Sequence, residues 1–203
     1  MARIGIVYWS MYSSTYDLAR SLADGVEKAG GEAHLRRIPD PLLPDEVKES
    51  DGVKQAIEAQ ADVTEASVEE LPEFDGLLLG SPTRYGASAA QVQNFFDQCG
   101  ALWAEGKLVG KAAGFFTGAA TMHGGHESTI LGMSTFAYHQ GMVIVPVGYG
   151  AAAEVGSTAT GGGPYGPTHL SRMGAEPGLS DDEEAIALSY GQHFHGIATK
   201  LAA

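Results

Sequence analysis

Five hydroxyl-bearing side chains lie within six positions, at residues 10–15, directly after an apolar run at residues 4–9. An amphipathic pattern follows at residues 18–26, with apolar side chains four positions apart. This order predicts a strand, a hydroxyl-rich loop and a helix. Because a helix N-terminus presents unpaired N–H groups and the positive end of the helix dipole, such a loop can bind a phosphate. The alternative is that a serine of the loop, Ser13 or Ser14, only caps the helix.

The composition of this loop narrows the kind of phosphate. The loop holds no Lys or Arg, and no glycine lies between Ser10 and Thr15. A nucleoside triphosphate loop carries a Lys that balances its charge, and a dinucleotide loop carries G-x-G-x-x-G. Hydroxyls and amides alone suit one terminal phosphate monoester, such as that of FMN.

Two further loops could approach a planar heterocycle. The sequence GSPTRYG at residues 80–86 combines a stiff proline, glycines that permit close backbone approach, and Tyr85, which has a flat face and a polar tip. The sequence GAATMHGG at residues 118–125 is small and rich in glycine. Each also has a plain interpretation, as a tight turn with an exposed tyrosine and as a common glycine loop.

The elements that must position these loops alternate along the chain. Ser180 and Glu183 fit the capping box of a last helix. Residues 45–70 show only a weak helical pattern, and a Gly-rich connection spans residues 148–177. Strand-like runs lie at residues 2–9, 32–38, 74–80, 111–117 and 142–147, and helical patterns at residues 14–30, 87–102, 127–140 and from 180 onward.

Strands that alternate with helices predict an α/β fold with a doubly wound, five-stranded parallel sheet and right-handed crossovers. In such sheets ligands bind beyond the carboxyl ends of the strands. The three loops follow the first, third and fourth strands, so we expect them to converge there. The length of 203 residues fits one domain, residues 1–203.

Charge and composition exclude several classes of protein. The formal charge of −13 disfavours nucleic acid, because its phosphates would be repelled. We find no signal-peptide pattern and no apolar run of about 18 residues, so we expect a cytoplasmic protein without membrane insertion. The single cysteine, Cys99, excludes an internal disulfide, and its place on an apolar helical face predicts a packed thiol.

Several motifs together resemble one family. They are YWSMY at residues 8–12, SPTRYG at 81–86, FFDQ at 95–98, GALW at 100–103, GK at 110–111, GMVIVP at 141–146 and GGPYG at 162–166. In this order they resemble the flavodoxin-like superfamily, and more closely its WrbA family of FMN-dependent NAD(P)H:quinone oxidoreductases. The resemblance implies helices on both faces of a sheet with strand order 2-1-3-4-5. It also implies a homotetramer, built as a dimer of dimers.

The activity that the resemblance implies is two-electron reduction of quinones to hydroquinones, with NAD(P)H as the reductant and FMN as the cofactor. A flavodoxin-type carrier that moves electrons without turning over NAD(P)H is the alternative. A scaffold that has lost its flavin is a third possibility. Its only support is the third loop, where Ala119, Ala120, Met122 and His123 interrupt a segment that the resemblance implies is richer in glycine. No residue is expected to be a catalytic nucleophile, because the cofactor carries the chemistry.

The same resemblance implies which residues bind each ligand. Trp103, contributed by a neighbouring subunit, and Tyr12 are expected to contact the substrate. One last flavin contact is expected from His139 or Gln140. The remaining FMN contacts are expected from Ser10, Met11, Tyr12, Ser13, Ser14, Thr15, Pro82, Thr83, Arg84, Tyr85, Gly86, Thr117, Gly118, Ala119, Ala120, Thr121, Gly124 and Gly125.

Other residues invite a different chemistry. His123 and His126 lie near a carboxylate, but in a flexible glycine segment without a second pair of ligands, so we expect no metal. His193 and His195 are two apart on the last helix and are expected to be solvated. Ser10 follows a strand but lacks the G-x-S-x-G elbow of a hydrolase. Trp103 lies between Gly100 and Gly106, which favours a pocket on a loop over a core position.

Overall fold

The computed structural model describes residues 1–174 and 178–203. Its centre is a parallel sheet in the order β2-β1-β3-β5-β6, which confirms the predicted order of five strands. The short strand β4 forms a hairpin with β3, and β7 pairs with β5. The strands are β1 (Arg3–Tyr8), β2 (Glu32–Arg37), β3 (Gly76–Arg84), β4 (Ala87–Ser88), β5 (Ala112–Ala119), β6 (Val143–Ile144) and β7 (Thr168–Leu170).

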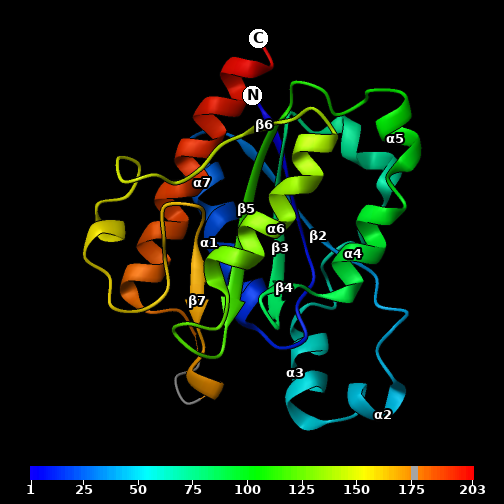
Figure 1. Cartoon of the computed structure of the whole chain (residues 1–203), viewed down its shortest axis with the longest axis vertical. Coiled ribbons are helices and arrows are strands. Elements are labelled where there is room, and N and C mark those ends of the chain that lie inside the picture. The colour runs from blue at the N-terminus through cyan, green and yellow to red at the C-terminus, as the bar shows by residue number, and fades with distance from the viewer. Residues whose placement is uncertain (175–177) are drawn as a thin grey trace.

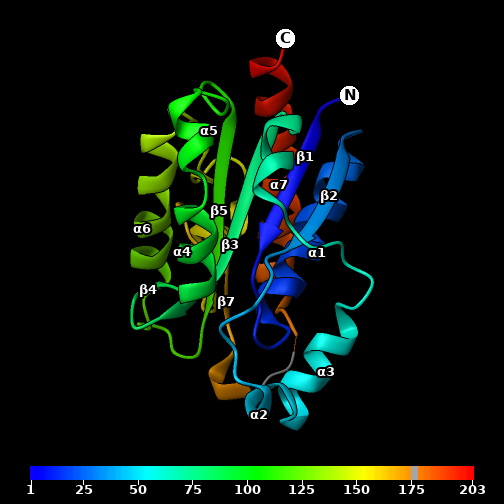
Figure 2. The same ribbon diagram turned by 90° about the vertical axis from the view of Figure 1, so that its right-hand side faces the viewer.

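Helices cover both faces of the sheet, as Figures 1 and 2 show. α1 (Ser14–Lys28) and α7 (Asp181–Leu201) cover one face. They pack closely, because a Cβ added at Gly25 of α1 would lie 2.2 Å from the Leu188 carbonyl of α7. The other face carries α4 (Ala90–Asp97), α5 (Gly100–Ala104) and α6 (His126–His139). Each face buries its own apolar cluster.

The segment that follows β2 lies beyond the carboxyl end of the sheet, below it in Figure 1. It holds α2 (Asp45–Lys48) and α3 (Asp51–Ala59). The chain then returns through the 3₁₀ turn η1 (Val68–Glu73) to the start of β3, where Arg3 Nη1 donates to the Glu73 carbonyl. α3 borders the first loop, since a Cβ added at Gly52 would lie 3.5 Å from the ring of Tyr12. Two further 3₁₀ turns are η2 (Ala153–Gly156) and η3 (Arg172–Gly174).

The fifth position of the sheet is split between two short strands, where the sequence predicted one strand at residues 142–147. β6 pairs with the start of β5, and the chain leaves the sheet after Val145 donates to Ala113. Pro146 has no N–H with which to continue the ladder. β7 pairs with the end of β5, so the connection predicted at residues 148–177 contains a strand. Residues 175–177 of that connection lie outside the described residues.

Other element boundaries also differ from the predictions. The helix predicted at residues 87–102 is instead β4, α4 and α5, with a break between α4 and α5 at residues 98–99. β3 and β5 run on through Arg84 and Ala119, so part of each predicted loop is strand. The capping box of the last helix is confirmed, with Ser180 accepting from the Glu183 N–H. None of the helices in the described part of the chain is long and apolar enough to cross a membrane.

Candidate functional site

The first loop ends in a buried hydroxyl that lacks a partner. Thr15, in the first turn of α1, is 1% exposed, and its Oγ1 makes no hydrogen bond within the described residues. Ser13 stands at the N-cap but makes no side-chain cap, so the interpretation of this loop as a simple cap is wrong for Ser13. Ser10 turns its hydroxyl to the Tyr12 carbonyl. The buried Thr15 hydroxyl therefore has no acceptor among the described residues, next to the N-terminus of a helix, where backbone N–H groups also need acceptors.

The second loop is the turn of the β3–β4 hairpin. Tyr85 and Gly86 both adopt positive φ, 54° and 82°, so the turn requires left-handed backbone at two consecutive positions. The Gly86 N–H donates to Thr83 Oγ1 at 3.2 Å, which closes the turn. At its base, the Ala89 N–H donates to Ser81 Oγ at 2.8 Å. The Tyr85 side chain is fully exposed at the tip.

The three loops meet at the carboxyl edge, as predicted. Arg84 of the second loop donates to the Met11 sulfur of the first at 3.3 Å. Between the second and third loops, Thr83 Oγ1 donates to the Gly124 carbonyl at 3.3 Å. A Cβ added at Gly125, where φ is 102°, would lie 2.6 Å from the Gly86 Cα. This close approach requires a glycine at position 125.

The third loop also contacts the first. Gly118, near the end of β5, lies beside α1, since a Cβ there would be 3.5 Å from the Ser14 Cβ. Thr117 Oγ1 donates to the Ser81 carbonyl at 2.6 Å, which joins the ends of β5 and β3. The backbone of β3 and β5 thus places small residues next to the hydroxyl-rich loop.

Few charges reach this site. Burial lowers the pKa of Arg84, whose guanidinium makes no ion pair with any described residue. Burial raises the pKa of Asp17 in α1, although hydrogen bonding by Ser13 and the charge of Arg20 oppose the shift. A site of hydroxyls, amides and one half-buried guanidinium suits a single phosphate next to an uncharged ring system.

A buried charge network supports the end of β5 from the side of β7. Glu183 is 1% exposed and accepts from His169 Nδ1 at 2.8 Å. Its other oxygen accepts from the Gly161 and Leu170 N–H groups, each at 2.8 Å. Burial alone would raise the pKa of Glu183, but the hydrogen bonds from His169 and the backbone outweigh it, and the pKa is lowered.

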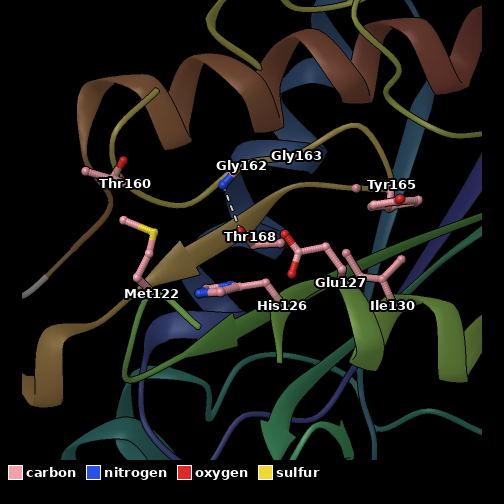
Figure 3. Close-up of a pocket in the computed structure, with 10 residues that line it drawn as sticks. Met122, His126, Glu127, Ile130, Thr160, Gly162, Gly163, Tyr165 and Thr168 are labelled. Carbon is pink, nitrogen blue, oxygen red and sulfur yellow. Dashed lines mark hydrogen bonds between the residues drawn. The ribbon is translucent and has the colours of Figure 1, made fainter. Parts of the chain in front are cut away.

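A small cavity of about 60 Å³ lies beside the third loop (Figure 3). His126, the first residue of α6, lines it and is 5% exposed, and neither ring nitrogen has a partner within the described residues. Burial lowers the pKa of His126, although Glu127 opposes that shift. Across the cavity, the Gly162 N–H donates to Thr168 Oγ1 at 2.7 Å. Within residues 1–174 and 178–203, no three His, Cys, Asp or Glu side chains group as metal ligands would.

Three residues predicted for the site are not brought to the loops. His139 and Gln140 end α6, which begins at the third loop and runs back along the sheet. A helix of 14 residues spans roughly 20 Å, so within one chain these side chains cannot reach the loops. Trp103 lies in α5, at the end of the molecule opposite α2 and α3. If these residues contact the cofactor or substrate, they must do so from another copy of the chain.

Some predictions about single residues are settled by burial. Trp103 is helical, contrary to the loop prediction, but 61% exposed, which excludes the core alternative. Cys99 is packed as predicted, and burial raises the pKa of its thiol to about 12. The solvated role predicted for His195 is wrong. This ring is buried against the Gly31 turn, where a Cβ would lie 2.4 Å from it.

Two groups of residues that support the site by hydrogen bonds were not predicted from the sequence. Ser128 and Thr129 of α6 bond to the second loop, at 2.8 Å to the Gly86 carbonyl and 2.8 Å to Thr83 Oγ1. Asp40 accepts the indole N–H of Trp9 at 2.8 Å. Of these residues, only Asp40 could have been noticed in the sequence, because it is an acidic residue in a segment with three prolines directly after a predicted strand.

The parallel sheet in this order, with three loops joined at the carboxyl edge, defines a flavodoxin-like protein with a ligand site at the switch point of the sheet. The Thr15 hydroxyl, which has no partner among the described residues, lies at a helix N-terminus and fits the phosphate of a flavin mononucleotide.

Comparisons with known proteins agree with this class. A family model described as NADPH-dependent FMN reductase matches residues 3–156, so the chain belongs to this family. It is similar to an NAD(P)H dehydrogenase (quinone) of Geobacter sulfurreducens, 44% identical over 97% of each chain. Another NAD(P)H dehydrogenase (quinone), of Aromatoleum aromaticum, is 41% identical over 98% of this chain and 97% of that protein. A WrbA-like flavodoxin structure from Agrobacterium tumefaciens shares the fold, with a TM-score of 0.68, 22% identity, and 98% and 99% coverage.

Proposed function

We propose that this protein is an FMN-dependent NAD(P)H:quinone oxidoreductase that reduces quinones to hydroquinones in two-electron steps. The observation that carries the proposal is the convergence of the three loops at the carboxyl edge, beside a helix N-terminus whose Thr15 hydroxyl has no partner among the described residues. Relatives with full-length similarity that bear the name NAD(P)H dehydrogenase (quinone) support it. The chemistry that bound FMN supplies is two-electron transfer between a nicotinamide and a quinone.

In this proposal the chain's own residues bind and orient the cofactor. Ser10, Met11, Tyr12, Ser13, Ser14 and Thr15 hold the phosphate at the N-terminus of α1. The ring system lies at the edge where the second and third loops meet. The contacting residues are Pro82, Thr83, Arg84, Tyr85 and Gly86 of the second loop, and Thr117, Gly118, Ala119, Ala120, Thr121, Gly124 and Gly125 of the third.

A second part of the proposal concerns assembly. Exposed apolar side chains gather where α5, the end of α6 and β6 meet, and we call them the amino-edge patch: Trp103, Val109, Tyr138 and Val143. The segments that carry Val109, Tyr138 and Val143 are joined by backbone hydrogen bonds from Gly110 to Gly141 and from Val143 to Lys111. Such a patch favours burial against another copy. A homotetramer built as a dimer of dimers would bring Trp103, and His139 or Gln140, to a neighbour's loops.

The test starts from purified apoprotein. We expect it to bind FMN with a stoichiometry of one and to reject FAD, whose second phosphate and adenosine have no glycine loop. Nicotinamide and quinone should exclude each other at one open face. Varying benzoquinone at several NADH concentrations should then give the parallel double-reciprocal lines of a ping-pong enzyme. A flavodoxin-type carrier would bind FMN equally well but oxidise NADH no faster than free FMN does. Failure to bind FMN would refute the whole proposal.

A further inference from the structure

Asp40 joins three segments at the carboxyl edge of the sheet. Its Oδ2 accepts the indole N–H of Trp9 at 2.8 Å, and Gln91 of α4 donates to its two oxygens at 3.2 and 3.3 Å. Its Oδ1 also accepts from the N–H groups of Leu42 and Leu43, at 3.1 and 2.9 Å. One carboxylate therefore fixes the end of β1, the start of α4 and the loop that leads into α2.

The most buried of these donors is the indole of Trp9. Trp9 follows β1 directly, is 4% exposed, and donates its backbone N–H to the Gly80 carbonyl at 3.2 Å. A buried indole N–H requires an acceptor, and Asp40 supplies it. With its backbone held by β3 and its ring held by Asp40, the indole is fixed in orientation.

The indole in turn supports Arg84. The Arg84 guanidinium lies over the Trp9 ring, with Cζ 5.5 Å from the ring centre, a cation–π arrangement. It also donates to the Thr83 carbonyl at 3.0 Å and to the Met11 sulfur at 3.3 Å. The orientation of the indole therefore sets where the one cation of the second loop lies, and how the first two loops are joined.

We propose that Asp40 is a positioning residue for the cofactor, which acts through Trp9 on Arg84. This inference rests on the proposed function, because it concerns FMN at the loops. Arg84 has no carboxylate partner within the described residues, so its charge is left to act on a ligand. A fixed cation beside a ring that gains negative charge on reduction stabilises the reduced form and raises its midpoint potential. Loss of Asp40 should therefore weaken FMN binding and lower that potential.

The test is a double-mutant cycle with Asp40→Ala, Trp9→Phe and the double variant. The phenylalanine keeps a ring beneath Arg84 and removes the N–H that Asp40 accepts. Two quantities are measured, the dissociation constant of FMN by fluorescence titration and the midpoint potential of the bound flavin. We expect each single variant to raise the dissociation constant roughly tenfold and to lower the potential, with no further change in the double variant.

Asp75→Ala is the matched control. Asp75 also accepts a backbone N–H, that of Arg3 at 2.8 Å, but it does so at the start of β3, far from the loops. It should lower the stability of the fold and leave both FMN quantities unchanged. If Asp40→Ala does not fold, Trp9→Phe carries the test alone, because it breaks the same hydrogen bond.

The outcomes separate the two proposals. Wild-type protein that does not bind FMN refutes the proposed function. Wild-type protein that binds FMN, together with additive effects in the cycle or a potential unchanged by Trp9→Phe, overturns only the role of Asp40. Asp40 would then be a structural link between α4 and the loop at Leu42.

Discussion

The carboxyl and amino edges of the sheet differ in the groups that they leave without a partner. At the carboxyl edge the loops bond to one another through polar groups, and the buried Thr15 hydroxyl has no partner among the described residues. At the amino edge the Gly110 N–H donates to the Gly141 carbonyl, and the side chains left exposed there are apolar, including Tyr138, which is 69% exposed. A buried hydroxyl without a partner favours binding of a ligand that can accept its hydrogen bond, whereas an exposed apolar surface favours contact with another protein surface.

This difference explains why the predicted site residues fall into two groups. Those on the loops meet within one chain, but Trp103 and His139 lie at the far end of helices that run away from the loops. The carboxyl edge is therefore expected to decide cofactor binding, and the amino edge to decide assembly and, through it, the substrate side of a neighbour's site.

The largest effect is expected from a change at the Thr15 hydroxyl. Thr15→Glu would place a carboxylate against the phosphate, and we expect loss of FMN binding, by about 1000-fold or more. Thr15→Val removes only the hydroxyl and should weaken binding about 10- to 100-fold, since hydrogen bonds to charged groups contribute about 1.5–3 kcal/mol. Titration of each apoprotein with FMN measures both.

The valine variant also tests whether the unpaired Thr15 hydroxyl serves ligand binding or the stability of the fold. Burial of an unpaired hydroxyl costs free energy, so Thr15→Val apoprotein should unfold at equal or higher denaturant concentration than the wild type. Thr135→Glu, on the exposed side of α6, is the control for added charge and should bind FMN normally. A valine variant that is less stable and binds FMN as well as wild type would mean that Thr15 serves only the fold.

A smaller effect is expected when the amino-edge patch is charged. Val109→Asp with Tyr138→Asp should shift sedimentation at micromolar concentration from an oligomer to a monomer, with at least about 30-fold weaker association. The affinity of this variant for FMN should change far less than its association does, because the loops of each chain are unaltered. Ile57→Asp, at an exposed apolar residue of α3, is the matched control and should leave the oligomer intact. Wild-type protein that is monomeric and fully active would contradict the assembly proposal.

Trp103→Ala should have a still narrower effect. We expect kcat/KM for benzoquinone to fall roughly tenfold, because a wall of the substrate side is removed, while FMN affinity stays within about twofold. Since the side chain is mostly exposed within one chain, the variant should also keep its stability. A variant that loses FMN before it loses turnover would place Trp103 in the cofactor site instead.

The sequence was sufficient for the carboxyl edge because its signals are local. Apolar runs fix the strands, and the loops follow them directly, so convergence at one edge is a consequence of topology. It was insufficient where long-range pairing decides. The connection at residues 148–177 reads as Gly-rich loop, yet three of its residues pair with β5 as β7, held by Glu183 from the last helix. Nothing near Thr168 in the chain indicates that partner.

The ends of helices show the same limit. The pattern at residues 87–102 gives an apolar face throughout, yet the helix is broken at residues 98–99. The spacing of two between His193 and His195 predicts solvated rings, but the Gly31 turn packs against the ring of His195. The distance of His139 from the loops follows from the direction of α6, which the sequence could have shown.

The smallest expected effect is the pH dependence of stability, which should also differ between the carboxyl and amino edges. Glu183 ties β7 to the end of β5 by a charged network, whereas the amino edge has no buried carboxylate of this kind among the described residues. The pKa of Glu183 is lowered in the folded state. A depressed pKa contributes stability that is present above the unfolded value, near 4.5, and is lost as pH falls through the folded value. Acid should therefore loosen the carboxyl edge first.

Glu183→Gln tests this directly. It keeps the shape of the side chain and removes its titration, so its free energy of unfolding should change less than that of the wild type as pH falls below about 4.5. We expect the difference between the two proteins, about 2 kcal/mol at pH 7, to shrink under acid. Urea unfolding at a series of pH values measures it, and FMN release should follow the same curve. Equal pH slopes for the two proteins would mean that Glu183 supports β7 by hydrogen bonds alone, and that its charge does not set the acid stability of the loops.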